Sequence, residues 1–304
     1  MKLGHTIEDS RKKYPELTGE LLNELRAWSE ENGVSGIPDA QLGIFAHSCY
    51  YDVEATKKCM SVYYRLRSTV PELFANRDPR NAAVQQTCKT CAFFALPEPD
   101  NYGNKVIMHR LMDYRPGSYV MQDAIKVMMM TVDASLYSDG CTPGYVFLLD
   151  MTGVKLGHLT RISIGTLRKF VEYVQDGLPL RLKAIRLVNC VWFIDKILAL
   201  LRPIMNRKLF NMMHLHTGEI SEIYEHIQPK CLPKDFGGEL EPTATLHAEH
   251  CAKFDELRDY FCEEERLFRG WSRKASCEKR RPSTASSGSE TEDKTANKTV
   301  DGDT

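Results

Sequence analysis

The stretch GYVFLLDM at residues 144–151 decides the fold of this chain. A continuous apolar run of this kind is expected of a β-strand that is buried on both faces of its sheet. Two further strands are predicted at residues 106–112 and 184–189, and apolar side chains recur at helical spacing between the strands, over residues 121–136 and 167–174. Strand–helix–strand alternation at this spacing predicts an α/β fold with right-handed crossovers and a mainly parallel sheet.

The N-terminal part before this sheet is predicted to be helical. Apolar side chains between Leu17 and Trp28 recur at three- and four-residue steps, which is typical of an amphipathic helix. A further helix is expected over residues 53–70. A helical run is also predicted over residues 82–96, and it contains the only CxxC motif of the chain, at residues 88–91. Because no second such pair exists, a structural zinc site is not expected.

These patterns divide the chain into four parts. Residues 1–79 form a helical module, residues 80–245 an α/β domain, and residues 246–271 a helical C-terminal extension. Residues 272–304 are rich in Ser, Thr, Lys and Glu and show no apolar periodicity. This tail is expected to be disordered, because it has too little apolar surface to bury.

Charge and composition exclude several classes of protein. The 304 residues contain 40 lysines and arginines against 41 aspartates and glutamates, a formal net charge of −1, so a globally basic nucleic-acid binder is excluded. No stretch is long and apolar enough for a transmembrane helix, and the first residues lack the apolar core of a signal peptide. We therefore expect a cytoplasmic protein whose ten cysteines are free thiols.

No pattern typical of a catalytic or metal centre is present. The sequence lacks a GxSxG nucleophile elbow, a P-loop, a GxGxxG turn and an HExxH helix. His214 and His216 have no third metal ligand nearby in the sequence. We therefore favour the interpretation that one of them forms a hydrogen bond in the core and the other is solvated. Asp150 ends a buried strand, where a structural cap is favoured over a role in an active site. We expect no enzymatic activity, no metal and no cofactor.

An apolar helix flanked by positive charge follows the third strand. Residues 192–204 are apolar almost all round, so this helix is either buried or covers something apolar. Between residues 181 and 208 only Asp195 is acidic, whereas the basic residues are Arg181, Lys183, Arg186, Lys196, Arg202, Arg207 and Lys208. Cations beside exposed apolar side chains favour an anionic membrane surface, to which each Lys or Arg contributes about 1 kcal/mol. The alternative is a solvated charged face.

Two segments carry a resemblance to the CRAL-TRIO family of lipid-binding domains. DGLPLRLKAIRLVN at residues 176–189 resembles the family's segment that leads into its inner strand, and CLPKDFGGEL at residues 231–240 resembles its closing LPxxYGG motif. Further similar positions are Asp113 and Tyr114, residues 150–153, His158, and YDVEA at residues 51–55, which resembles a turn of the companion helical module. The resemblance covers roughly residues 17–240 and is strongest to the α-tocopherol transfer, clavesin and retinaldehyde-binding subgroup.

This resemblance implies a carrier in which the sheet forms the floor of a closed apolar cavity. The pocket positions of the family correspond here to Val127, Thr131, Tyr145, Ile162, Phe170, Tyr173, Val174, Leu180, Leu182 and Ile185. A movable lid helix would span about residues 191–212 and present Phe193, Ile194, Ile197, Leu198 and Leu201. The resemblance also favours cavity lining over plain core packing for the methionines at residues 128–130.

The same subgroup binds phosphoinositide head groups in a basic cleft. Arg181, Lys183 and Lys208 occupy matching positions. The chain departs from the subgroup where arginines are expected, because it has Met212 one turn after Lys208, and His47 and Cys49 in a motif of the N-terminal module. We expect Arg202 and Arg207 to compensate for these losses.

Two functions follow from the resemblance. The favoured one is a carrier that binds a small hydrophobic lipid, tocopherol- or retinoid-like, and exchanges it at an anionic, phosphoinositide-containing membrane with which it associates peripherally and reversibly. The alternative is a phosphoinositide-dependent membrane adaptor with no transported ligand. A nucleic-acid partner is not expected.

Overall fold

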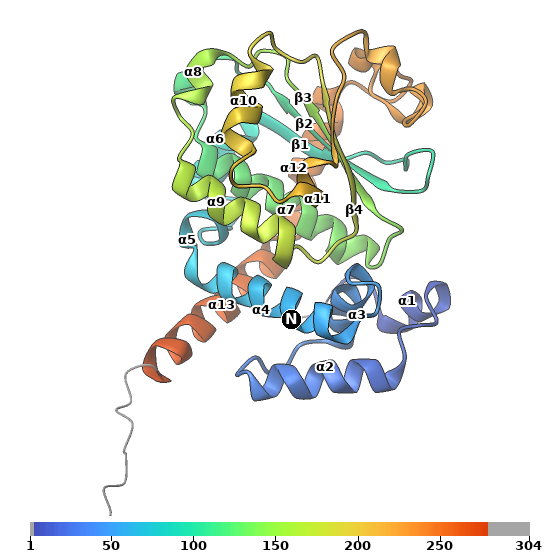
Figure 1. The fold of residues 1–304 in the computed structure, drawn as a ribbon, viewed down its shortest axis with the longest axis vertical. Coiled ribbons are helices and arrows are strands. Elements are labelled where there is room, and N and C mark those ends of the chain that lie inside the picture. Colours follow the sequence, from blue (N-terminus) through green and yellow to red (C-terminus); the bar gives the residue numbers. More distant parts are fainter. Residues whose placement is uncertain (1–2, 279–304) are drawn as a thin grey trace, which may run out of the picture.

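The computed structural model describes residues 3–278 and shows a helical N-terminal part followed by a five-stranded sheet with helices on both faces (Figure 1). The predicted α/β fold with a mainly parallel sheet is confirmed. No helix in the described range is long and apolar enough to cross a membrane.

The N-terminal helices begin where short polar side chains cap them. Thr18 accepts a hydrogen bond from the backbone N–H of Leu21, and Asp52 accepts one from Ala55 at 2.8 Å, so both satisfy a donor that the first helical turn leaves free. The helices of this part are α1 (Ile7–Lys13), α2 (Gly19–Glu31), α3 (Asp39–Ser48), α4 (Val53–Thr69), α5 (Pro71–Phe74) and α6 (Ala82–Thr90).

The helical run predicted over residues 82–96 is wrong in its second half. Helix α6 ends at Thr90, and β1 (Cys91–Ala95) follows at once. The apolar sequence CAFFA has no partner nearby in the chain, but it pairs in antiparallel register with β2 (Lys105–Leu111). This long-range ladder overrides the local helical pattern. The two cysteines of the CxxC motif consequently belong to different elements, with Cys91 buried in the core.

The sheet has the strand order β1-β2-β3-β4-β5. Its other strands are β3 (Tyr145–Asp150), β4 (Leu182–Val188) and β5 (Met213–Leu215). Strands β2 to β5 are parallel to one another, and only β1 runs antiparallel to its neighbour. The three predicted strands are therefore the centre of the sheet, and the two strands that the sequence did not indicate are its edges.

Alternate side chains of β3 enter different cores. Tyr145 and Phe147 pack on the face covered by α7 (Met121–Asp139) and α9 (Ile164–Glu172), whereas Val146 and Leu148 pack on the face covered by α12 (Thr243–Glu256). The short helices α8 (Leu156–Leu159) and α10 (Ile194–Leu201) lie on the α7 side. The first five residues of the strand are all apolar because both of its faces are buried.

The predicted lid helix over residues 191–212 is shorter than expected. Helix α10 ends at Leu201, a turn around Pro203 follows, and a second short helix, α11 (Arg207–Phe210), precedes β5. Proline has no N–H for a helical hydrogen bond, and its ring clashes with the preceding turn. The segment is therefore two helices joined by a bend.

A buried network of four charges joins distant parts of the chain. Arg67 of α4 contacts Asp133 of α7 at 2.6 Å and Glu264 of α13 (Arg258–Glu278) at 3.1 Å. Arg77 contacts the second oxygen of each carboxylate, and none of the four side chains is more than 3% exposed. The Tyr173 hydroxyl accepts two further hydrogen bonds from Arg67. Two arginines thus balance two carboxylates inside the protein.

The C-terminal helix returns to the N-terminal module. Helix α13 packs against α4, and Figure 1 shows it crossing back from the sheet domain toward the N-terminal helices. Its backbone continues past residue 272, where the sequence suggests that the helical extension ends, to Glu278. Most of the tail predicted over residues 272–304 lies outside the described residues.

We predict that Asp133→Asn lowers the free energy of unfolding by about 3–5 kcal/mol, because it leaves two buried arginines facing one carboxylate. Urea unfolding measures this difference. The control Glu72→Gln breaks the Lys169–Glu72 pair, whose side chains are 46% and 33% exposed, and should cost less than about 1 kcal/mol. Equal losses in the two variants would contradict the role of the network.

Candidate functional site

An apolar cavity of about 290 Å³ lies between the sheet and the helices of the α7 side. Every wall comes from a different element, so the cavity exists only in the folded domain. The sheet contributes Phe93, Leu111 and Leu149, α7 contributes Met121, Ile125 and Met128, the α8–α9 region contributes Leu159, Ile162, Leu167 and Phe170, and α10 contributes Ile197, Leu200 and Leu201. Burial of apolar ligand surface here is favourable by about 25 cal/mol per Å².

The cavity has three polar side chains in its lining: His109, Tyr119 and His158. His158 Nδ1 lies 2.9 Å from the backbone nitrogen and 3.2 Å from the backbone oxygen of Lys155, so this ring nitrogen is occupied by its own turn. The other ring nitrogen, Nε2, is buried and has no hydrogen-bond partner. Burial lowers the pKa of His158 and lowers the pKa of His109 to about 4, so both imidazoles are neutral near pH 7. The cavity therefore offers one neutral imidazole nitrogen that is free to form a hydrogen bond, and no charge.

Helix α10 forms the wall between this cavity and solvent. Ile197 and Leu201 are one turn apart and face the cavity, whereas Asp195, Lys196 and Arg202 are exposed. The other predicted lid residues pack nearby without lining the cavity. Ile194 and Leu198 join the small core beside Met151, and Phe193 is buried next to Trp192.

Trp192, just before α10, is 79% exposed. The ammonium group of Lys196 lies 5.7 Å from its ring. A large aromatic side chain beside a lysine is suited to the interface between water and a lipid bilayer.

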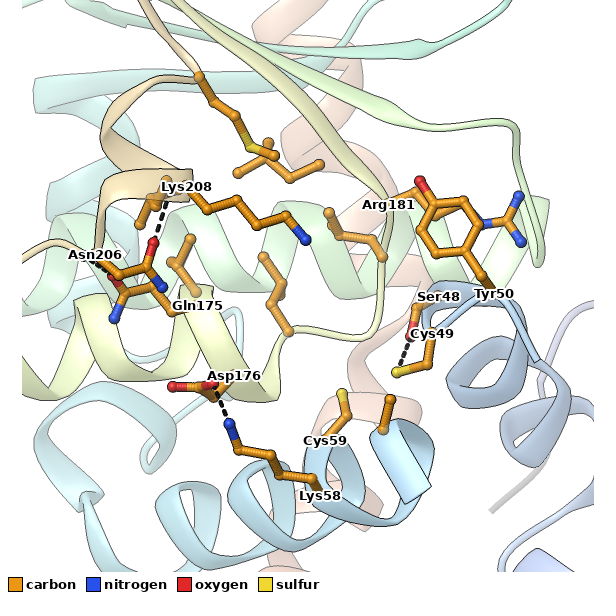
Figure 2. A pocket seen from close by; sticks show the side chains of 17 residues that line it. Ser48, Cys49, Tyr50, Lys58, Cys59, Gln175, Asp176, Arg181, Asn206 and Lys208 are labelled. Atoms are coloured by element: carbon orange, nitrogen blue, oxygen red, sulfur yellow. Dashed lines mark hydrogen bonds and ion pairs between the residues drawn. The ribbon is translucent and has the colours of Figure 1, made fainter. Parts of the chain in front are cut away.

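A second hollow, the basic cleft, lies between the N-terminal module and the start of β4 and has a volume of about 360 Å³ (Figure 2). Lys58, Arg181 and Lys208 line it, and Figure 2 shows the Lys208 ammonium group reaching into its middle. Lys58 forms an ion pair with Asp176 at 2.9 Å. Lys58 is a cation that the sequence did not indicate, because only the packing of α4 against residues 173–177 brings it here.

Arg181 is fixed by the turn between α3 and α4. Its guanidinium lies 4.1 Å from the centre of the Tyr50 ring, and its Nε donates a hydrogen bond to the backbone oxygen of His47 at 2.7 Å. Tyr50 and Tyr51 both have left-handed backbone conformations, with φ of 55° and 67°. Such conformations cost about 1–3 kcal/mol each for residues other than glycine, and persist where the surroundings fix them. Arg181 is part of that surrounding structure.

His47 does not face the basic cleft. Its Nε2 donates to the backbone oxygen of Thr142 at 2.8 Å, and its Nδ1 lies 3.1 Å from the Tyr51 hydroxyl. The side chain is buried, and this burial lowers its pKa to about 4. His47 is consequently neutral and supports the Tyr50–Tyr51 turn, so it adds no positive charge where the subgroup has an arginine.

Cys49 and Met212, the other two departures, do line the cleft. Cys49 lies opposite Cys59 in Figure 2, and the hydrogen bond from Cys59 lowers the pKa of the Cys49 thiol to about 7. Neither side chain is a cation, so the cleft carries less positive charge than it would with arginines at these two positions.

The ten predicted pocket positions are distributed over three environments. Ile162 and Phe170 line the apolar cavity, whereas Val174, Leu180 and Leu182 line the basic cleft. The remaining five are packed in the interior: Val127, Thr131, Tyr145, Tyr173 and Ile185. Their polar groups have protein partners, as Thr131 contacts His250 at 3.1 Å and Tyr145 contacts Ser135 at 3.2 Å.

The remaining candidate residues lie outside the two hollows. Arg202 and Arg207 are exposed and do not line the cleft, whereas Lys183 donates to the Tyr50 hydroxyl at its edge at 3.1 Å. Met121 and Met128 line the cavity, but Met129 and Met130 are core residues. The spacing of the methionines in the sequence predicted this helix, but it did not show which methionines line the cavity and which pack in the core.

The structure supports the capping role of Asp150. Its Oδ1 accepts hydrogen bonds from the backbone N–H of Thr152 and from the Asn189 side chain, at 3.0 and 2.8 Å. Among residues with described side chains, no group of three or more His, Cys, Asp or Glu is arranged to hold a metal ion. His214 is exposed on β5.

Comparisons with known proteins agree with this architecture. Residues 89–238 match the CRAL/TRIO domain family, and residues 14–84 match the Pinta-like UBA domain family. Alpha-tocopherol transfer protein-like from Homo sapiens is 26% identical over 257 residues, which are 83% of this chain and 70% of that protein. Clavesin-2 from Rattus norvegicus is 23% identical over 186 residues, which are 61% of this chain and 57% of that protein.

Among solved structures, the crystal structure of Sfh5 is similar over 81% of this chain and 93% of the Sfh5 chain, with a TM-score of 0.45 and 11% sequence identity. Neither matching family and neither of the two relatives has the name of an enzyme. This agrees with the expectation of a non-enzymatic protein.

The buried neutral His47 predicts a loss of stability in acid. The unfolded histidine takes up a proton near pH 6.5, whereas the folded one does so only near pH 4, so the free energy of unfolding should fall between these values as the pH is lowered. In His47→Gln this contribution should be lost, and urea unfolding at pH 7.5, 5.5 and 4.5 should show a shallower pH dependence than in the wild type. The same slope in both proteins would contradict it.

Proposed function

We propose that this chain, whose residues 89–238 match the CRAL/TRIO domain family, is a lipid carrier that binds one small hydrophobic molecule in the apolar cavity and exchanges it at membranes. The observation that carries this proposal is the cavity itself: its walls are mainly apolar, and its buried His158 Nε2 has no hydrogen-bond partner. An apolar ligand with a single hydroxyl or carbonyl group is complementary to this arrangement. Tocopherols and retinoids are ligands of that chemistry.

The size of the cavity limits its ligand. Its volume of about 290 Å³ is at the lower end of the range of about 300–1,000 Å³ found for ligand sites. A compact isoprenoid suits it as it stands, whereas a longer chain requires α10 to move outward. The bend around Pro203 separates α10 from α11 and is the natural hinge for that movement.

We assign membrane contact to the surface beside α10. Trp192 is exposed there, with the cations Lys196 and Arg202 on the same segment. Aromatic and cationic side chains together favour peripheral binding to an anionic bilayer. In this arrangement α10 would open toward the membrane, so that the ligand would pass between the cavity and the bilayer with little exposure to water.

We assign phosphoinositide head-group contact to the basic cleft. Lys58, Arg181 and Lys208 are held around one hollow, and cations donating to phosphate form strong hydrogen bonds. Lys183 borders the cleft at Tyr50. Arg202 and Arg207 lie outside the cleft and would supply general attraction to negative charge rather than head-group contact.

The carrier proposal is tested by native mass spectrometry of the purified protein, followed by organic extraction. We expect a stoichiometric lipid mass on the wild type and its loss in Met128→Trp, whose larger side chain fills the cavity. Met205→Trp is the matched control, because Met205 is also half-buried but lies outside the cavity. Apo protein that also resists loading with tocopherol and retinoids would instead favour the membrane adaptor.

The head-group assignment predicts different losses for two charge reversals. Lys208→Glu should abolish the preference for vesicles containing phosphatidylinositol bisphosphate over vesicles with an equal charge of phosphatidylserine. Arg202→Glu should weaken binding to both kinds of vesicle equally, because this side chain is exposed outside the cleft. Vesicle sedimentation measures both effects. An unchanged preference in Lys208→Glu would refute the assignment.

A further inference from the structure

A third hollow, of about 480 Å³, lies on the face of the sheet opposite the apolar cavity. Val146 and Ala184 form its floor, and both belong to the core on the α12 side. Its polar lining is Asp100, Tyr102, Asn104, Lys183, Arg186, His214 and His226. Lys183 also donates to Tyr50 at the edge of the basic cleft, but the cavity and the basic cleft leave the other side chains of this set unexplained. Below it is called the Arg186 pocket.

Arg186 is a buried cation without a carboxylate partner. Its residue is only 8% exposed, and its one hydrogen-bond contact is to His216 Nε2 at 3.4 Å. Burial lowers the pKa of its guanidinium. The other two buried arginines, Arg67 and Arg77, each contact two carboxylates. A buried charge that is unpaired is strongly destabilising, so Arg186 is the exception that requires an explanation.

The one carboxylate in the lining is already occupied by its own turn. Asp100 Oδ1 accepts from the backbone N–H groups of Tyr102 and Asn104 at 2.9 and 2.8 Å, and its Oδ2 accepts from the Asn104 side chain at 2.9 Å. These bonds hold Asp100 in the loop after β1 rather than on Arg186. Asp100 and Glu225 both attract the Arg186 guanidinium from a distance, but neither forms an ion pair with it.

A β-bulge directs Lys183 to the same pocket. Tyr145 of β3 is opposite Leu182, but the next residue, Val146, is opposite Ala184, so Lys183 is an extra residue in the ladder. Bulges change the direction of a side chain and are common beside binding sites. The bulge places an ammonium group three residues before Arg186 at the edge of the pocket.

Imidazoles complete the lining. His226 Nδ1 is buried without a hydrogen-bond partner, while its Nε2 lies 2.9 Å from Glu225. His214 lines the pocket from β5. The pocket thus combines one guanidinium and one ammonium group with an imidazole nitrogen that is an acceptor on the neutral ring, because Nε2 donates to Glu225.

We propose that the Arg186 pocket binds a phosphate group, with the Arg186 guanidinium as its central donor and Lys183, His214 and His226 around it. The planar guanidinium matches the oxygens of a phosphate and donates to two of them at once. A bound phosphate would also supply the counter-charge that Arg186 lacks. This site is separate from the basic cleft, and it does not depend on the lipid proposal.

The test is isothermal titration of the full chain with inorganic phosphate, against chloride at equal ionic strength. We expect saturable binding and a raised Tm in the wild type, and at least tenfold weaker binding in Arg186→Gln. Arg202→Gln, which removes an exposed cation, should bind as the wild type does. In chloride, Arg186→Gln should be at least as stable as the wild type, because it removes an unpaired buried charge. If that variant does not fold, His214→Ala replaces it, since His214 is exposed and lines this pocket but not the basic cleft.

Competition identifies the source of the phosphate. Displacement of bound phosphate by soluble inositol trisphosphate would assign the site to a soluble head group, and displacement by vesicles with phosphatidylinositol bisphosphate would assign it to a lipid. Displacement by neither would assign it to free phosphate. Each of these three outcomes supports the proposal. No phosphate-specific binding in the wild type, or equal affinity in Arg186→Gln, would overturn it. Loss of vesicle binding in Lys208→Glu leaves this result unaffected, so the two proposals fail separately.

Discussion

Two arginines held between two buried carboxylates are the contact on which the rest of the structure depends. Arg67 comes from α4, Asp133 from α7, Glu264 from α13, and Arg77 from the loop between α5 and α6. Moving any of these elements would leave an unpaired charge in the core, which costs several kcal/mol. The helical module, the sheet domain and the C-terminal helix are therefore held together as one unit. The basic cleft, which lies between α4 and β4, keeps its shape for the same reason.

Strand β4 and the segment after it bring the three hollows into one region. Because successive side chains point to opposite faces, Ile185 packs on the α7 side while Arg186 faces the pocket on the α12 side. A shift of the strand by one residue would exchange these faces. Farther along, Leu201 lines the apolar cavity and Lys208 lines the basic cleft. A ligand in the cavity and a head group in the cleft would thus contact the two halves of one short, bent segment.

The candidate site was only partly accessible to sequence reasoning. Ile162, Phe170, Ile197 and Leu201 were indicated and do line the cavity. The resemblance also placed Tyr173 in the pocket, but its hydroxyl is taken up by the buried arginine network. Whether an apolar side chain in a predicted helix faces a cavity or a packed core depends on what lies opposite, and that neighbour comes from another part of the chain.

The amino-acid sequence alone was enough to predict the central strands, the helices between them, the N-terminal helices and the similarity to the CRAL/TRIO domain family. All of these depend on periodicity and short motifs, which neighbouring residues carry. Only the tertiary structure decided that Cys91–Ala95 is a strand, that His47 points away from the cleft, that Lys58 enters it, and that Arg186 is buried without a carboxylate. Strand pairing, burial and the partner of a charge are set by residues far away in the chain, and no local pattern records them.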